Sequence, residues 1–315
     1  MREDLPSSPY YHLKDIAPGV YVALARPQSD AGSNSAIIDL GNRTVMIDAF
    51  TLPQAAAELR DTAKLLTGHA VDLVLLTHHH LDHIWGCQAF SDDVCLFSSE
   101  DTLHKIIEAG PVDIENNRKG SQEALRQAQE NLKSASSQEQ RAQIEEQIAY
   151  ARKSLAVIES IKIRLPNMTS QGPVSFYGTR RSLEFLPQPH AHAPGNAIIR
   201  LPQENIVFVG DLLFTKIHPY TGDADIAGWI DVLEKIVAMQ PEQVVPGHGP
   251  LSQAKDLQTL ADYFRLLTEK VQAFVQAGKP ANALAEIEVP EPYASWEPKF
   301  FLEKTLDGLY GRYKE

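Results

Sequence analysis

The chain has 315 residues with 43% hydrophobic and 22% charged side chains, a composition typical of a globular protein with one large core. The formal net charge of −12 and the scattered Lys and Arg residues exclude a basic face that follows nucleic-acid phosphates. Two cysteines, Cys87 and Cys95, exclude a disulfide framework in a chain of this length.

The N-terminal segment Met1–Pro6 lacks the basic start and apolar run of a signal peptide. No apolar run of about 18 residues occurs later in the chain. We therefore expect a cytoplasmic protein that neither spans a membrane nor binds nucleic acid, unless a leader has been removed from the sequence.

Strand and helix patterns alternate through the first hundred residues. Residues 1–15 are polar and aromatic and are expected to cover the surface. Apolar runs predict a strand at 19–25 and a hairpin at 35–40 and 44–48 across the Gly41-Asn42 turn. Apolar residues recur at helical spacing over 54–66, before Gly68 as a stop signal, and a buried strand follows at 71–76.

A cluster of imidazoles follows that buried strand, in the segment Thr77–Gly86. His78 and His80, two residues apart at a strand end, can reach one metal ion, while Asp82 and His83, about one turn further on, can face a second. The alternative is a group of solvated surface histidines that titrate near neutral pH. A chance cluster of this density is rare, so the spacing favours a metal site.

A strand is predicted at 94–97 and a helix start at Ser99-Glu100-Asp101, after which the composition changes. Residues 111–164 are rich in Gln, Glu, Ala, Lys and Arg, and apolar side chains recur at spacings of 3 and 4 on both sides of Ser134–Ser137. This pattern predicts an inserted helical hairpin. It is compatible with a solvated decoration, a lid over the metal site or a homodimerisation arm, and the sequence does not choose among them.

The second half returns to short strands. We expect them at 174–177, 182–186, 197–201, 205–210 and 243–245, with helices at 228–239 and 254–277. The C-terminal tail 278–315 carries several large aromatic residues that pack or lie over the cleft.

The motif His78-x-His80-x-Asp82-His83 resembles the signature of the metallo-β-lactamase superfamily, which includes glyoxalase II, lactonases and lactamases. Three further elements of the family pattern occur in order: His192 before Pro194-Gly195, Asp211 at the end of a strand, and His248 in Pro246-Gly247-His248. The resemblance covers roughly residues 16 to 270. It implies one αββα sandwich over 1–315, with two mixed sheets flanked by helices and interrupted by the hairpin at 111–164.

The resemblance implies a binuclear zinc site. One ion would take His78, His80 and His192, the other Asp82, His83 and His248, and Asp211 would bridge them. A metal-bound hydroxide would cleave a small carbonyl substrate (a thioester, lactone, β-lactam or ester), with Asp82 also orienting water or carrying a proton.

Two residues distinguish this sequence from particular branches of the superfamily. Asp211, not Cys, follows Gly210, and the second motif ligand is His80, not Glu. These residues disfavour one lactamase class and the oxygen-reducing diiron branch, and the bridging Asp211 is closer to the thioesterase and lactonase branches. Two alternatives stay open: a mononuclear iron (Fe²⁺) persulfide dioxygenase and a non-catalytic metal-binding scaffold.

Several other residues need assignment. His79 points away from its neighbours in an extended segment and is expected to be structural, and Cys87 is expected to be a packed thiol. His190 competes with His192, but the Pro-Gly turn favours His192. His218 and Tyr220 follow Asp211 in a loop and are either substrate contacts or surface residues. Asp48 either supports the metal site from outside, as in relatives, or caps the following helix.

Overall fold

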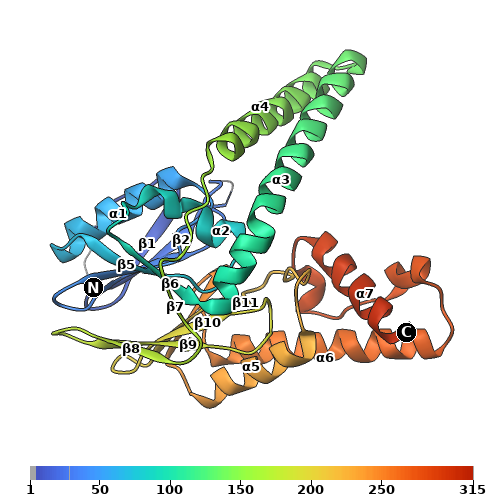
Figure 1. The fold of residues 1–315 in the computed structure, drawn as a ribbon. Coiled ribbons are helices and arrows are strands. Elements are labelled where there is room, and N and C mark those ends of the chain that lie inside the picture. The colour runs from blue at the N-terminus through green and yellow to red at the C-terminus, as the bar shows by residue number, and fades with distance from the viewer. Residues whose placement is uncertain (1–4, 28, 315) are drawn as a thin grey trace.

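The computed structural model describes residues 5–27 and 29–314, so part of the N-terminal segment used to argue against a leader lies outside the described residues. Two β-sheets pack face to face, with helices on the outer face of each (Figure 1). This arrangement confirms the predicted αββα sandwich with its helical insertion.

The first sheet has seven strands in sequence order: β1 (Tyr11–Ala17), β2 (Val20–Ala25), β3 (Ser35–Asp39), β4 (Thr44–Ile47), β5 (Val71–Leu75), β6 (Cys95–Ser99) and β7 (Met168–Ser170). Strands β1 to β4 are antiparallel, whereas β4 to β7 are parallel. The expectation that residues 1–15 only cover the surface is wrong for β1. Tyr11 and Leu13 are buried and His12 and Lys14 exposed, the alternation of a half-buried edge strand.

The second sheet has five strands in the order β12 (Gln243–His248), β11 (Ile206–Phe214), β10 (Ala197–Leu201), β9 (Ser182–Pro187) and β8 (Val174–Tyr177). Strands β11 and β12 run parallel. The crossover between them contains helix α5 (Ile226–Ala238), and helix α6 (Ala254–Gln276) follows β12. Both helices lie close to their predicted bounds.

The core consists of three layers of apolar side chains. Between the sheets, Phe97 of β6 meets Phe176 of β8 and Phe185 of β9 edge to face at 5.2 and 4.9 Å. Helix α1 (Pro53–Thr67), which starts with Pro53 and ends at Gly68 in the left-handed conformation, covers the first sheet. Helices α5 and α6 cover the second.

The insertion forms a helical arm made of α3 (Glu100–Ser134) and α4 (Gln138–Ser160), which projects from the sandwich (Figure 1). Ala128 of α3 packs on Ile144 and Ile148 of α4, with Leu125 and Leu132 alongside, so the two predicted stripes do face each other. The first helix begins at Glu100, capped by Ser99, as the sequence predicted. It was not predicted that this helix continues without a break through Pro111 into the insertion.

The C-terminal tail contains the short helices η2 (Ala281–Glu286) and η3 (Tyr293–Ser295) and the helix α7 (Lys299–Lys314). Trp296, Leu306 and Tyr310 are buried in the same cluster as α6. The tail therefore belongs to the folded body. Among the helices of residues 5–27 and 29–314, none combines the length and hydrophobicity needed to cross a bilayer.

Candidate metal centre

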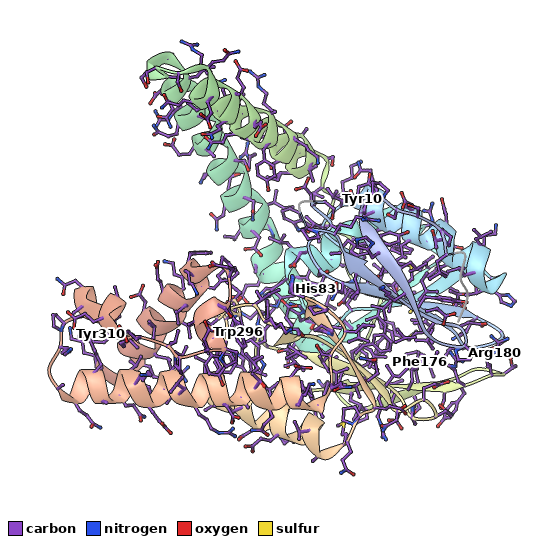
Figure 2. All side chains as sticks on the ribbon, turned by 180° about the vertical axis from the view of Figure 1, so that it is seen from behind. Tyr10, His83, Phe176, Arg180, Trp296 and Tyr310 are labelled. Atoms are coloured by element: carbon purple, nitrogen blue, oxygen red, sulfur yellow. The ribbon has the colours of Figure 1, made fainter. Side chains whose placement is uncertain are left out.

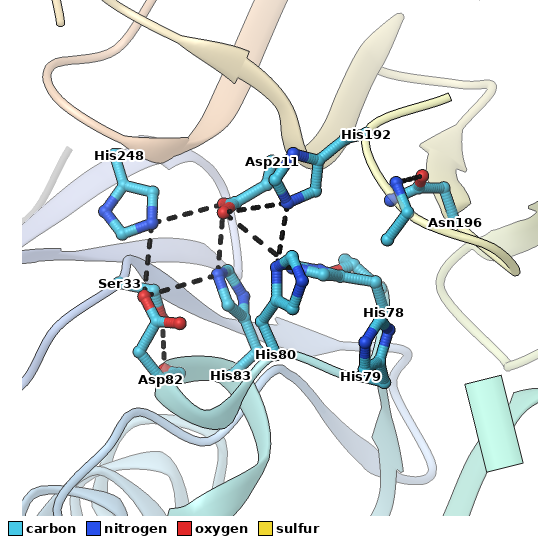
Figure 3. A network of polar contacts seen from close by, with 12 residues as sticks. Ser33, His78, His79, His80, Asp82, His83, His192, Asn196, Asp211 and His248 are labelled. Carbon is cyan, nitrogen blue, oxygen red and sulfur yellow. Dashed lines mark hydrogen bonds and ion pairs between the residues drawn. The ribbon is translucent and has the colours of Figure 1, made fainter. Parts of the chain in front are cut away.

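The predicted ligands come from strands of the second sheet and from segments that follow or precede strands of both sheets. His78 and His80 follow β5, and Asp82 and His83 lie on the one-turn helix α2 (Leu81–Ile84). The parallel strands β11 and β12 bring Asp211 and His248 together. His248 ends β12, but the expectation that Asp211 ends its strand is wrong, because β11 continues past it to Phe214. The loop before β10 supplies His192. Figure 3 shows all of these side chains converging on one point.

A first group consists of His78, His80, His192 and Asp211. The Nδ1 atom of His80 lies 3.0 Å from Nε2 of His78 and 2.9 Å from Nε2 of His192. Oδ2 of Asp211 lies 3.7 Å from Nε2 of His78 and 3.5 Å from Nε2 of His192. Ligands about 2.0–2.1 Å from a tetrahedral ion lie about 3.3 Å apart, so these spacings fit one ion at the centre.

A second group consists of Asp82, His83 and His248. Nε2 of His248 lies 3.2 Å from Oδ2 of Asp82, and Nε2 of His83 lies 3.8 Å from the same oxygen. The second oxygen of Asp211, Oδ1, lies 3.0 Å from Nε2 of His83 and 3.3 Å from Nε2 of His248. Each carboxylate oxygen of Asp211 therefore faces a different group of nitrogens.

The two groups differ in their electrostatics. Burial lowers the pKa of His78 and His192 well below the usual value, so both are neutral imidazoles with a free lone pair. Burial also opposes the charged form of His83 and His248, but nearby carboxylates outweigh it. At His83 these are Asp211, Asp48 and Asp82. At His248 they are Asp211 and Asp82. The pKa of His83 is raised well above its usual value and that of His248 to about 10. The carboxylates around the second group therefore stabilise positive charge at this place.

A buried carboxylate holds the motif from outside. Oδ2 of Asp48 lies 2.7 Å from Nδ1 of His83 and accepts from the hydroxyl of Thr77 at 2.8 Å, while Oδ1 accepts from the backbone N–H of Thr77 at 2.8 Å. Helix α1 has Leu52, not Asp48, at its N-cap. The structure therefore favours the supporting role over the helix cap, because Asp48 orients His83 so that its Nε2 faces the centre.

A second carboxylate supports the first group. Nε2 of His80 lies 2.9 Å from Oδ2 of Asp223, in the loop before α5, which leaves Nδ1 to face the centre. The turn that carries His192 is held by Asn196, whose side-chain oxygen accepts from the N–H of Ala193 at 2.7 Å (Figure 3). Both contacts fix the direction in which a ring nitrogen points.

Close packing of the backbone sets the position of the bridging carboxylate. A Cβ at Gly247 would collide with Oδ1 of Asp211, so only glycine lets the β12 turn come this close. The side chain of Asn34 donates at 3.0 Å to the carbonyls of Pro246 and Gly249 and so holds the turn that carries His248.

The residues present fit divalent metal ions. Nδ1 of His80 faces Nε2 of both His78 and His192, yet a hydrogen can join only one of these pairs and leaves the third nitrogen unpaired. Nε2 of His83 lies 3.0 Å from Oδ1 of Asp211, a pairing that requires a proton on His83. A buried nitrogen without a partner needs one, and a cation bound by nitrogen and oxygen ligands would supply it and replace the proton on His83.

The structure also places the other residues considered in the sequence analysis, His190, His79 and Cys87. His190 is exposed, and its Nε2 lies 2.7 Å from the backbone carbonyl of Asp223, so it does not join the centre, whereas His192 does. His79 lies in the cleft wall near His80 and Asp223, outside both of the groups described above. Cys87 is a buried free thiol whose pKa burial raises to about 12, as a packed cysteine requires.

The structure separates His218 from Tyr220. His218 is completely buried, with Nδ1 2.8 Å from the hydroxyl of Tyr263 and the ring against Trp296. It takes a packing position and does not line the cleft. Both expectations for His218, a substrate contact and a surface residue, are therefore wrong. Tyr220 does line the cleft, and its ring lies 5.4 Å from that of His80.

Some residues of the site carried no recognisable sequence signal. Asp223 lies 143 positions from His80 in the chain, and Trp229 packs on the ring of His192 at 4.9 Å. Phe214 stacks on His248 with centroids 4.9 Å apart. In sequence, Trp229 and Phe214 are indistinguishable from ordinary core positions.

The centre lies at the bottom of a cleft of about 760 Å³, a size typical of small-molecule sites. His80, Asp82, Asp211 and His248 face it, and its walls come from α3 and α7. Figure 2 shows His83 where the base of the helical arm, the sandwich and the segment around Trp296 meet.

Comparison with known proteins agrees with this geometry. The family model described as "Metallo-beta-lactamase superfamily" matches residues 29–94 and 104–248. A metallo-beta-lactamase type 2 from Bacteroides fragilis is 41% identical over 63 residues, which span 18% of this chain and 25% of that relative.

Two solved structures share the fold. A metallo-beta-lactamase from Pontibacter korlensis has a TM-score of 0.60 and 18% identity, covering 81% of this chain and 99% of that chain. The inverting sec-alkylsulfatase Pisa1 from Pseudomonas sp. has a TM-score of 0.67 and 17% identity, covering 96% of this chain and 50% of that chain. The family model spans both groups of the centre, from Asp48 to His248, and with the shared fold this shows that the chain belongs to the metallo-beta-lactamase superfamily.

Proposed function

We propose that the chain is a hydrolase that holds two Zn²⁺ ions and cleaves a small carbonyl substrate, namely a thioester, lactone, β-lactam or ester. Membership of the superfamily supports a metal-dependent hydrolase. The number of ions, their identity and the substrate are the proposal.

The observation that carries the two-ion proposal is the placement of Asp211. Its Oδ2 faces His78 and His192, while its Oδ1 faces His83 and His248. A mononuclear centre needs only one of these groups. A carboxylate with one oxygen in each group fits a bridge between two ions.

The chain's own residues set the chemistry. When bound, a pair of divalent cations supplies Lewis acidity and the means to ionise water near neutral pH. Burial raises the pKa of Asp82, but the charge of His83 and the hydrogen bond with His248 outweigh this effect and lower it to about 2. Asp82 is thus an ionised carboxylate at the floor of the cleft, where it can orient a water molecule and accept its proton.

The experiment that tests the proposal combines metal analysis with turnover. Protein purified without added metal should contain about two zinc ions per chain by mass spectrometry, and chelation should abolish hydrolysis of chromogenic esters, thioesters, lactones or β-lactams. Sulfate and phosphate esters serve as comparison substrates because one fold neighbour is a sec-alkylsulfatase. Asp211→Asn should lower the metal content and abolish turnover.

Two outcomes would overturn the proposal. One iron per chain together with oxygen uptake on a persulfide would indicate a dioxygenase. Metal binding without turnover on any panel would indicate a scaffold. Tyr177→Ala, at an exposed residue at the end of β8, serves as the control variant that should keep both metal and activity.

A further inference from the structure

We propose that the cleft selects substrates with an uncharged, apolar acyl group, which lies along a wall formed by Tyr220, Phe301 and Phe300 and faced by Val112. This inference rests on the proposed function and names its substrate class.

A row of aromatic rings leads out of the metal centre. The ring of Tyr220 lies 5.4 Å from that of His80, the ring of Phe301 lies 5.9 Å from Tyr220, and that of Phe300 lies 4.7 Å from Phe301. All four residues line the same cleft. A group that leaves the reacting carbonyl therefore meets a continuous apolar surface.

The far end of this row carries exposed apolar side chains on both sides. Phe300 of α7 is 53% exposed and Val112 of α3 is 55% exposed, and both line the cleft. Figure 1 shows α7 beside the lower part of α3, and both helices contribute residues to the cleft lining. Exposed apolar side chains on facing walls mark a surface that gains free energy when a ligand covers it.

The charges of the cleft exclude a dedicated anion site in the walls. Among the described lining residues, Lys105 is the single Lys or Arg, and its Nζ is paired with Glu108 at 2.8 Å. Asp113 and Asp223 also line the cleft, so its field repels an anionic tail. A carboxylate or sulfate at the end of the acyl group would find no free cation there.

Two of the three aromatic residues of the wall lie outside the matched part of the family. The family model includes Tyr220 but ends at residue 248, whereas Phe300 and Phe301 lie on α7 (Lys299–Lys314). Membership of the family therefore does not by itself predict this wall.

A matched series of esters tests the inference on the metal-loaded full chain. Hydrolysis adds water across the acyl C–O bond and releases p-nitrophenol and a carboxylic acid. From p-nitrophenyl acetate to hexanoate, kcat/KM should rise about twofold to fourfold per methylene, since complete burial of one methylene corresponds to about fourfold. Mono-p-nitrophenyl adipate, with the same chain length and a terminal carboxylate, should be hydrolysed no better than acetate.

Substitutions in the cleft test whether its wall residues cause the dependence on acyl chain length and charge. Phe300→Ala or Phe301→Ala should raise KM for the hexanoate about fivefold with little change in kcat, and change the acetate KM less than about twofold. Glu108→Gln releases Lys105 from its ion pair and should raise kcat/KM for the adipate about twofold to fivefold. Glu115→Gln is the matched control, because Glu115 pairs with Arg118 on the same helix outside the cleft.

Binding of amides that replace the ester distinguishes the proposed acyl selection from the proposed hydrolase activity. N-phenylhexanamide, an amide that replaces the scissile ester, should bind more tightly than acetanilide in calorimetric titration, and Phe300→Ala should remove the difference. If hydrolysis occurs but kcat/KM is independent of chain length, or if the adipate is preferred, the acyl selection is wrong and the hydrolase stands. If the amides show the difference and no ester is hydrolysed, the ester hydrolysis fails and the cleft assignment stands.

Discussion

Asp48 offers a direct test of how the metal centre is built. The Asp48→Asn substitution keeps the size of the side chain and suits the positive φ of 56° at this position, since asparagine tolerates that region. It removes the negative charge and one acceptor. The amide can still accept from Thr77, but its NH₂ group faces Nδ1 of His83, where Oδ2 of Asp48 now lies 2.7 Å away.

The size of the effect follows from the contact that is lost. A hydrogen bond to a charged group contributes about 1.5–3 kcal/mol, which corresponds to about a 10–100-fold change in affinity. The loss should fall on the ion held by Asp82, His83 and His248, because Asp48 touches no other residue of the centre except through Thr77. The first ion should bind nearly as before.

Competition titration with a chromogenic chelator measures both affinities on one sample. We expect Asp48→Asn to weaken one of two zinc-binding steps about 10–100-fold and to leave the other within about threefold. Asp39→Asn is the matched control. Asp39 is also a buried aspartate at a strand end, accepting from the N–H of Gly41 at 2.7 Å, but it lies outside the centre. Unchanged affinities in Asp48→Asn, or equal losses in both steps, would refute the proposed role of Asp48.

Other predictions concern single residues. His192→Gln should lose the first ion and at least about tenfold of turnover, whereas His190→Gln should keep both, as metal analysis and kinetics would show. Gly247→Ala should push Oδ1 of Asp211 away, lowering metal content and stability in denaturant titrations; normal zinc stoichiometry would contradict this close packing. Burial lowers the pKa of His218 to about 4, so the unfolded chain binds the extra proton between pH 6.5 and 4 and stability falls as pH falls through that window. His218→Gln should flatten this loss in urea titrations compared at pH 7 and 5, and an unchanged pH slope would show that His218 is not responsible.

The sequence predicts the metal centre well because its ligands follow strands with strong local signals. His78, His80, Asp82 and His83 lie within six residues of the chain, so their proximity requires no knowledge of the fold. Asp211 and His248 each follow an apolar run, and the parallel pairing of β11 with β12 brings them together, although β11 continues past Asp211 to Phe214. The supporting Asp223 is different, because its contact with His80 joins positions 143 residues apart. Only the docking of one loop on another creates it.

The boundaries of elements were less predictable for physical reasons that can be named. The start of α3 was predictable, because the Ser99 side chain accepts from the N–H of Thr102 and caps the helix there. The continuation of α3 through Pro111 was not, because proline usually interrupts a helix. Strand β1 was missed because Tyr11 and Leu13 alternate with polar residues over only a few positions. Pairing with β2 decides its conformation, and such pairing is not local information.

One residue of the cleft wall, Phe300, is recognisable from the helical periodicity of α7. The buried side chains of α7 are Thr305, Leu306, Leu309 and Tyr310, a stripe at helical spacing that packs on α6. Phe300 lies on the opposite stripe with Glu303, Lys304 and Asp307, all exposed. A phenylalanine on an otherwise charged helix face has no core to enter, so it either costs solubility or meets a ligand. Its position in the lining of the cleft that leads to the metal centre favours the ligand.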